Sequence, residues 1–197
     1  MKKSSIVLIG ILVLVVIIGF AGCGKYNSLQ KLDENVNGAW GAVETQYQRR
    51  ADLIDNLVAT VKGAANFEKS TLTEVINARA KATAVTINNT GDLSQEKIDQ
   101  FQAAQGELNG SLSRLLVSVE RYPELKATAQ FGELRAQIEG TENRIANARN
   151  DFNTTVRNFN SVIRTFPSNI VAGFSGLQQR GYFKSDAGAN KAPKVEF

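Results

Sequence analysis

Hydrophobic residues recur at every seventh position along the last third of the chain. One row runs without a break through Phe131, Ile138, Ile145, Phe152, Phe159 and Phe166. The alternate positions hold a second row of mostly smaller side chains, Leu134, Thr141, Ala148, Thr155 and Val162. A seven-residue repeat places side chains on one face of a helix, and a long apolar face must be buried against other helices. We therefore predict a long helix that ends at Pro167, with both rows in a helical core.

The segment from Tyr26 to about Glu68 contains no Pro and repeats the same spacing. Its apolar residues form three seven-residue rows: Trp40, Tyr47, Ile54 and Val61; Leu29, Val36, Val43 and Leu57; and Leu32, Ala39 and Leu53. Arg50 interrupts the second row and Gln46 the third. Intervals of three, four and seven place these rows on one broad face of a helix about 60 Å long. This helix could run on directly from the segment before it.

Two shorter helices are predicted between these long ones. The first spans about 68–84, with Leu72, Val75, Ile76 and Ala80 facing inward. After a turn rich in Asn and Gly, Ser94 is a good N-cap for the second. Its inward residues step by three and four: Ile98, Phe101, Gln105, Leu108, Leu112, Leu115 and Val119. Pro123 should break this helix and begin the next one.

The whole pattern predicts an all-α protein, since no stretch alternates apolar and polar residues as a half-buried strand does. We expect an antiparallel bundle of three to four long helices following an N-terminal membrane segment. The predicted division is 1–25 for the anchor or signal, 26–167 for the bundle and 168–197 for an extended C-terminal tail. The tail holds four Gly and an apolar patch, Ile170, Val171, Phe174 and Leu177. We expect that patch to dock on the bundle.

The amino terminus carries a membrane signal. Lys2 and Lys3 precede 21 uncharged residues, Ser4 to Gly24, which as a helix would span about 31 Å, enough for a hydrocarbon core of about 30 Å. The favoured interpretation is an uncleaved anchor, with the amino terminus inside. Alternatively, the sequence before Cys23 resembles a bacterial lipoprotein signal, which is cleaved before a lipid-modified Cys. Both interpretations tether the bundle to a membrane surface, and the basic residues before the span favour the outer (periplasmic or extracytoplasmic) side for the bundle.

Composition excludes several kinds of chemistry. The net charge is +4, and Lys2 and Lys3 supply half of it, so we expect no nucleic-acid partner. The chain has no His and a single Cys, which removes His-based triads, His metal sites and internal disulfides. Inward positions of the last helix carry no carboxylates that could form an all-carboxylate metal site. We expect no catalytic residue, no metal, no cofactor and no enzymatic activity.

The most polar cluster of the first long helix lies between Gln46 and Asn56. Arg49 and Asp52 are three residues apart and can pair on a helix surface, whereas Arg50 and Asp55 are five apart and should not. The simpler interpretation is a solvated face with an ion pair of about 0.3–0.5 kcal/mol. The alternative is a polar groove that recognises a partner. Arg49, Arg50, Asp52 and Asp55 are therefore the candidate polar surface.

Several longer motifs resemble the LemA family. They are QYQRRADLIDNLVATVKG at 46–63, ERYPELKA at 120–127, GTENRIANAR at 140–149 and KAPKVEF at 191–197. The family typically has Pro where this chain has Asp55, so we expect the helix to stay smooth there. The resemblance implies a bacterial protein with an amino-terminal membrane segment, a long helical bundle and no established catalytic activity.

Two functions from different classes remain open. The first is a non-enzymatic, membrane-anchored adaptor or scaffold that binds another envelope protein. The alternative is an envelope-surface module that binds lipid, cell-wall or small-molecule ligands between its helices. The adaptor is favoured because no cluster of polar residues that could form a pocket is visible in the helix seams. The sequence identifies neither the partner nor the oligomeric state.

Overall fold

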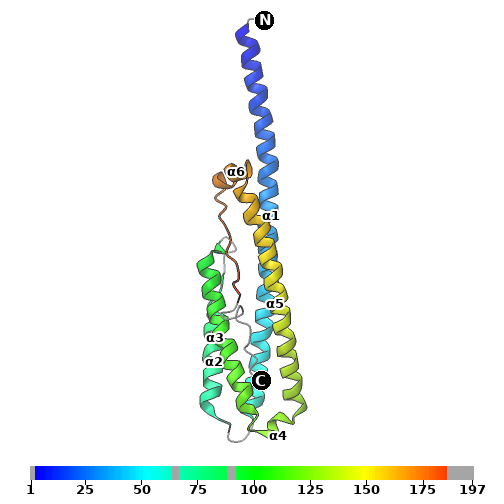
Figure 1. Cartoon of the computed structure of the whole chain (residues 1–197), viewed down its shortest axis with the longest axis vertical. Helices are drawn as coiled ribbons and strands as arrows, with labels where there is room; N and C mark the ends of the chain where they lie inside the picture. The colour runs from blue at the N-terminus through cyan, green and yellow to red at the C-terminus, as the bar shows by residue number, and fades with distance from the viewer. Residues whose placement is uncertain (1–2, 64–66, 88–91, 186–197) are drawn as a thin grey trace, which may run out of the picture.

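The computed structural model describes residues 3–63, 67–87 and 92–185, apart from the side chains of 3–9, 14–15 and 17–21. Six α-helices follow one another in these ranges: α1 (Lys3–Lys62), α2 (Lys69–Ala84), α3 (Gln95–Val119), α4 (Pro123–Lys126), α5 (Ala129–Arg164) and α6 (Ser168–Phe174). The described ranges contain no strand, so the all-α prediction is confirmed. The helices form an elongated rod (Figure 1).

Helix α1 is a single unbroken helix of 60 residues, about 90 Å long at 1.5 Å per residue. It passes smoothly through Asp55, as expected where Pro is absent. Leu29 is the first described side chain that is buried, and the part of α1 before it projects beyond the bundle (Figure 1). From Leu29 onward, the predicted apolar rows face the core, and Val36, Val43, Ile54, Leu57 and Val61 are fully buried.

Helix α5 runs antiparallel to α1 and packs along it (Figure 1). Thr128 caps its amino end by accepting a hydrogen bond from the backbone N–H of Phe131 at 3.4 Å. Five members of the predicted row are buried, from Phe131 through Phe159. The prediction for the sixth member of the row is wrong, because Phe166 is 79% exposed. Because a residue before Pro disfavours helical geometry, the helix stops at Arg164 and the seven-residue register no longer applies to Phe166.

Helices α2 and α3 form a second antiparallel pair. Ser94 caps α3 as predicted, accepting a hydrogen bond from the N–H of Lys97, and Pro123 lies in the first turn of α4. The predicted inward face of α2 is wrong in part, since Ile76 is 49% exposed and Ala80 is exposed. Its buried stripe is Leu72, Val75, Ala78 and Ala82. Helix α2 packs mainly on one helix, α3, so it buries only a narrow stripe and its neighbouring apolar side chains stay exposed to solvent.

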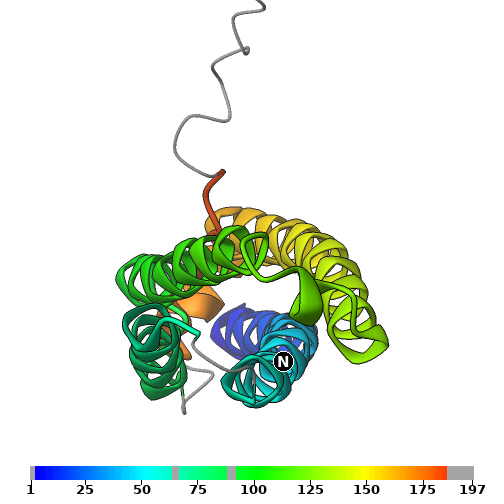
Figure 2. The same cartoon turned by 90° about the horizontal axis from the view of Figure 1, so that it is seen from below.

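Seen along the rod, α1, α2, α3 and α5 surround a common core (Figure 2). The buried apolar residues form two clusters, one in each half of the rod. The distal cluster, near α4, includes Leu57, Leu115 and Phe131. The proximal cluster, on the side where α1 leaves the bundle, includes Trp40 and Phe152.

The segment after Pro167 differs from the extended tail that the sequence predicts. Residues 168–174 form α6, which packs on α1 and α5, while the segment from 177 to 185 is extended along the bundle. Of the predicted apolar patch, Val171 and Leu177 pack against the proximal cluster, whereas Ile170 and Phe174 are exposed. Residues four apart share a face of a helix, so Ile170 and Phe174 lie together on the exposed side of α6 while Val171 faces the core. The stretch 186–197, with the KAPKVEF motif, lies outside the described residues.

Among the residues described, no helix has both the length and the apolar character that a membrane crossing needs. The predicted anchor, 1–25, falls largely on side chains outside the description, so it stays a prediction.

Two Phe residues of the same seven-residue row provide a test of the fold. Phe159→Ala should lower the free energy of unfolding by about 3–5 kcal/mol, because its fully buried ring would leave a cavity. Phe166→Ala should change it by less than about 0.5 kcal/mol, since that ring is exposed. Urea unfolding of the full chain in detergent, followed by circular dichroism, measures both. Equal losses would contradict the described end of α5.

Candidate functional site: a groove filled by the C-terminal tail

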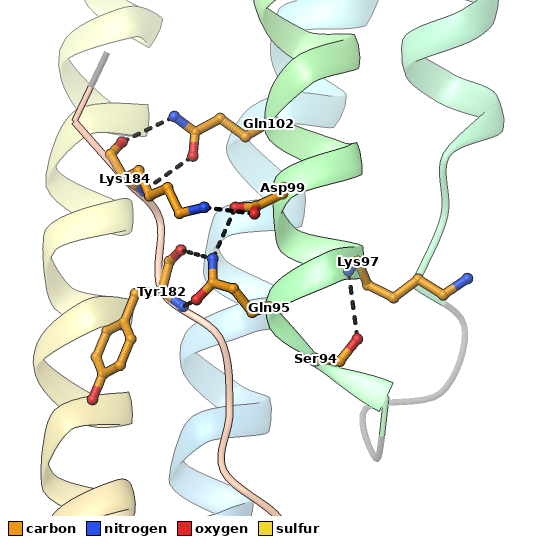
Figure 3. A network of polar contacts seen from close by, with 7 residues as sticks. All are labelled: Ser94, Gln95, Lys97, Asp99, Gln102, Tyr182 and Lys184. Atoms are coloured by element: carbon orange, nitrogen blue, oxygen red, sulfur yellow. Dashed lines mark hydrogen bonds and ion pairs between the residues drawn. The ribbon is translucent and has the colours of Figure 1, made fainter. Parts of the chain in front are cut away.

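The extended tail lies between α3 and α5 (Figure 1). Side-chain amides from both helices hold it, and Figure 3 shows the two from α3, Gln95 and Gln102. Four amides each bind the backbone N–H and C=O of one tail residue: Asn160 binds Arg180, Gln95 binds Tyr182, Asn153 binds Phe183 and Gln102 binds Lys184. The eight donor–acceptor distances lie between 2.8 and 3.1 Å. An amide that both donates to and accepts from one residue reproduces the pairing of a neighbouring strand. The groove therefore recognises extended backbone.

Phe183 anchors the tail in the proximal cluster. Its ring stacks on Trp40 with centroids 6.0 Å apart and makes an edge contact with Phe152 at 5.5 Å. The guanidinium of Arg149 lies 5.0 Å from the centroid of the same ring. Only 5% of Phe183 is exposed, so this tail residue is part of the core. Buried aromatic pairs of this kind stabilise a structure by about 0.5–1.5 kcal/mol beyond their area.

Charged side chains hold the two ends of this tail segment. Arg180 donates to Asp33 of α1 at 2.6 Å, and the two side chains are 6% and 17% exposed. At the other end, the ammonium of Lys184 lies 2.6 Å from Asp99 of α3 (Figure 3). The pair at Arg180 contributes more to specificity than the exposed pair at Lys184, because desolvation strengthens the interaction of charges that stay paired.

The pKa of Asp99 is lowered, first by its hydrogen bond to Lys184 and then by the amide of Gln95. The lowered pKa means that folding favours the ionised carboxylate. The contribution of this contact is therefore fully present above the ordinary Asp value near 3.9 and is lost as the pH falls through the folded-state pKa. At neutral pH the tail contact is complete.

Gly181 lets the tail approach the start of α3 closely. Its N–H donates to the carbonyl of Leu93 at 2.7 Å. A Cβ atom at this position would lie 2.6 Å from the Cα atom of Gln95 and 2.8 Å from its backbone nitrogen. Because backbone atoms cannot move aside as a flexible side chain can, only Gly fits here.

A buried polar layer separates the two apolar clusters. Arg50 of α1 is 3% exposed and donates to Glu142 of α5 at 2.8 Å and to Gln105 of α3. Gln105 in turn donates to the carbonyl of Ala82 in α2. The guanidinium of Arg50 thus links α1 to α3 and α5, and the amide of Gln105 extends the network to α2. The interruption that Arg50 makes in the apolar row of α1 marks this layer.

The structure separates the four residues of the candidate polar surface. Arg50 is in the core, whereas Arg49 and Asp52 are exposed on α1, where Asp52 accepts from Gln48 at 2.9 Å. Asp55 is paired with Arg79 of α2. Arg49 and Asp52 remain a candidate contact surface, together with the exposed Glu44 and Gln48 on the same side of α1.

The amides of the groove were not identified from the sequence, although they carry a signal. Gln95 and Gln102 are seven residues apart on α3, and Asn153 and Asn160 are seven apart on α5. On α5 each Asn directly follows a core Phe. Amide side chains that repeat every seven residues lie along one edge of a buried helix face. Because an amide can both donate and accept a hydrogen bond, such an edge indicates a neighbouring segment of backbone.

The sequence profile of the LemA family matches residues 39–197. The chain belongs to the LemA family. Its match covers α1 from residue 39 onward, the polar layer and the tail that fills the groove.

Relatives of this LemA-family chain include two kinds of named protein. It is 27% identical to Protein LemA of Metamycoplasma hominis over 153 residues, which cover 78% of this chain and 66% of the relative. It is 23% identical to Magnetosome protein MamQ 2 of Paramagnetospirillum magneticum over 178 residues, covering 81% of this chain and 65% of the relative. The chain therefore spans slightly less than two thirds of the length of these relatives.

Other candidate chemistry is sparse in the described part of the chain. Cys23 is an exposed free thiol on α1, and its lipidation stays a prediction. No group of three or more Cys, Asp or Glu side chains there is close enough to hold a metal ion.

Gly181→Ala tests the fit of the tail in the groove. The added methyl group should push the tail away from α3 and lower the free energy of unfolding by about 1–3 kcal/mol. Because Trp40 is the sole Trp and stacks on Phe183, its fluorescence emission should shift to longer wavelength. Gly140→Ala on the open face of α5 is the matched control and should stabilise by up to about 1 kcal/mol. An unshifted spectrum for Gly181→Ala would refute the described fit.

Arg50→Ala tests the polar layer. We expect a loss of about 2–4 kcal/mol in the free energy of unfolding, since it creates a cavity and removes a partner from the buried Gln105. Arg49→Ala, which removes the same side chain from the exposed face, should cost less than about 0.5 kcal/mol. Similar values for the two variants in urea unfolding would argue against a buried role for Arg50.

Proposed function

We propose that this LemA-family chain is a non-enzymatic, membrane-anchored adaptor whose bundle presents a fixed surface to another envelope protein. The observation that carries the proposal is α1, one unbroken helix that runs from Lys3 in the predicted anchor to Lys62 in the bundle. A flexible linker would let the bundle move freely, whereas a continuous helix holds it at a fixed distance from the bilayer. A fixed distance from the bilayer suits a protein that positions a partner.

The anchor is supported by the sequence of the projecting part of α1. Ile11, Leu12, Val13 and Val16 are each about half exposed or more, with no helix of the described bundle beside them. Exposed aliphatic side chains in a row are unfavourable in water and favourable in lipid. The projecting helix is therefore best suited to the hydrocarbon core of a membrane.

The partner-binding part of the proposal is supported by the exposed polar face of α1. Glu44, Gln48, Arg49 and Asp52 line an open depression that no other described helix covers. Both signs of charge are present within two turns, which favours a partner with complementary charges over a lipid or a polyanion. The groove between α3 and α5 is already filled by the tail, so we place the partner on α1.

Photo-crosslinking in native membranes tests this proposal. A photoreactive side chain at Asp52 should capture one reproducible protein partner, identified by mass spectrometry, and Arg49→Glu should reduce that adduct severalfold. A probe at Asn143, exposed on α5, with Arg144→Glu as the matched charge reversal, should not capture this partner. Capture of nothing at Asp52, or of the same proteins from both positions, would refute the adaptor.

Intact mass of the extracted protein tests the form of the anchor. A mass that starts at Met1 indicates a spanning helix, which we expect. A mass that starts at Cys23 with acyl chains indicates a lipoprotein and would replace the spanning helix with a lipid tether. A mass that starts elsewhere, without lipid, would refute membrane anchoring.

The alternative, a module that binds lipid, cell-wall or small-molecule ligands, has one favouring observation. An open groove of about 710 Å³ lies between α1 and α5 at the distal end, with Asn56, Thr60 and Gln137 in its lining. By contrast, the cavity between α1, α2 and α3 is about 110 Å³, well below the roughly 300–1,000 Å³ of typical ligand sites. Saturable thermal stabilisation of the full chain by a cell-wall fragment, lost in Gln137→Leu, would favour this alternative.

A further inference from the structure

One end of the rod carries a concentrated set of exposed apolar side chains. Phe166, Ile170 and Phe174 are 79%, 51% and 89% exposed. Ile170 and Phe174 are one helical turn apart on α6, and Phe166 lies two residues before the start of that helix. Elsewhere on the bundle and its tail, the described large apolar side chains that are exposed, Ile76 and Val117, stand singly. Single exposed residues are ordinary, whereas a group of them marks a contact surface.

The position of α6 indicates what this surface meets. Helix α6 lies at the end of the bundle where α1 leaves it, and it packs on α1 and α5 (Figure 1). Leu29, the first buried residue of α1, is only five residues after Gly24, the last residue of the uncharged stretch. Five helical residues span about 7.5 Å, and the polar layer on each side of a bilayer is about 5–8 Å thick. The end of the bundle that carries α6 would therefore lie against the lipid headgroups.

Charge at this end agrees with a lipid surface. Lys25, Lys31 and Arg164 are exposed there. Of the acidic side chains nearby, Asp33 is already paired with Arg180, which leaves Glu34 exposed. Aromatic side chains flanked by Lys and Arg are typical of segments that lie in the membrane interface.

We propose that Phe166, Ile170 and Phe174 form a second membrane contact, which inserts into the headgroup region beside the helix that anchors the chain. This inference rests on the proposed anchor, because α1 determines which end of the rod faces the bilayer. The contact fixes the tilt of the rod, since a single helix holds position but leaves the bundle free to lean. The three side chains are exposed in the isolated chain because their partner is lipid.

Site-specific photo-crosslinking to lipid tests the contact. Benzoylphenylalanine replaces Phe174 in the full chain, which is reconstituted in vesicles of phosphatidylcholine and phosphatidylglycerol. Under ultraviolet light it should form lipid adducts, detected by mass spectrometry. The matched control is the same probe at Val117, which is 71% exposed near the end of α3 that leads into α4, at the opposite end of the rod (Figure 1). Its lipid adducts should be severalfold fewer.

A third probe at Ile11 separates failure of this inference from failure of the anchor. Lipid adducts at Ile11 but not at Phe174 would overturn the second contact and leave the anchor intact. Adducts from Phe174 to a second copy of the chain would overturn it in favour of self-association. No lipid adduct at Ile11 would refute the anchor, and the second contact with it. Lipid adducts at both positions, with few at Val117, are the expected result.

Discussion

The proximal half of the core depends on the tail between α3 and α5. Helix α1 packs closely along α5 and α2 along α3, and the tail joins these two pairs through its hydrogen bonds to α3 and α5. Phe183 completes the aromatic cluster around Trp40, and the tail backbone satisfies four buried or half-buried amides. Without the tail, each amide would lose two hydrogen bonds inside a groove, at a cost of about 1–3 kcal/mol where water cannot replace them. Residues 180–184 of the tail are therefore an integral part of the proximal core.

Arg50 constrains the register of the helices in a different way. Apolar rows alone would allow α5 to slide along α1 by one heptad, because each row repeats itself. The guanidinium permits one alignment, in which it reaches both Glu142 and Gln105. A buried ion pair adds little to stability compared with apolar side chains of the same size. It does raise the free energy of any shifted register, because the charge of Arg50 would be buried there without its partners. The polar layer thus specifies the arrangement that the two apolar clusters stabilise.

The sequence predicted the helical rows well because burial follows the helix period wherever a helix continues. It placed Phe152 and Phe159 in the core for this reason. The sequence prediction failed at Phe166 because the seven-residue spacing was extended past the end of α5. It failed at Ile76 because α2 has one main partner helix and buries only a narrow stripe. Arg50 was noticed as a break in a row, but its partners lie 55 and 92 residues away and no local pattern joins them. The tail groove was missed for the same reason, since its contacts join positions 20 to 87 residues apart.

The two ends of the rod differ in a way that bears on function. The distal end closes through α4 and carries exposed ion pairs such as those of Glu120 with Lys126 and Arg135. The proximal end carries exposed Phe and Ile beside basic residues. In the proposed arrangement, a rod that stands on a bilayer meets lipid at the end with exposed Phe and Ile and water at the other end. The exposed face of α1 would then stay accessible to a partner that shares the same membrane.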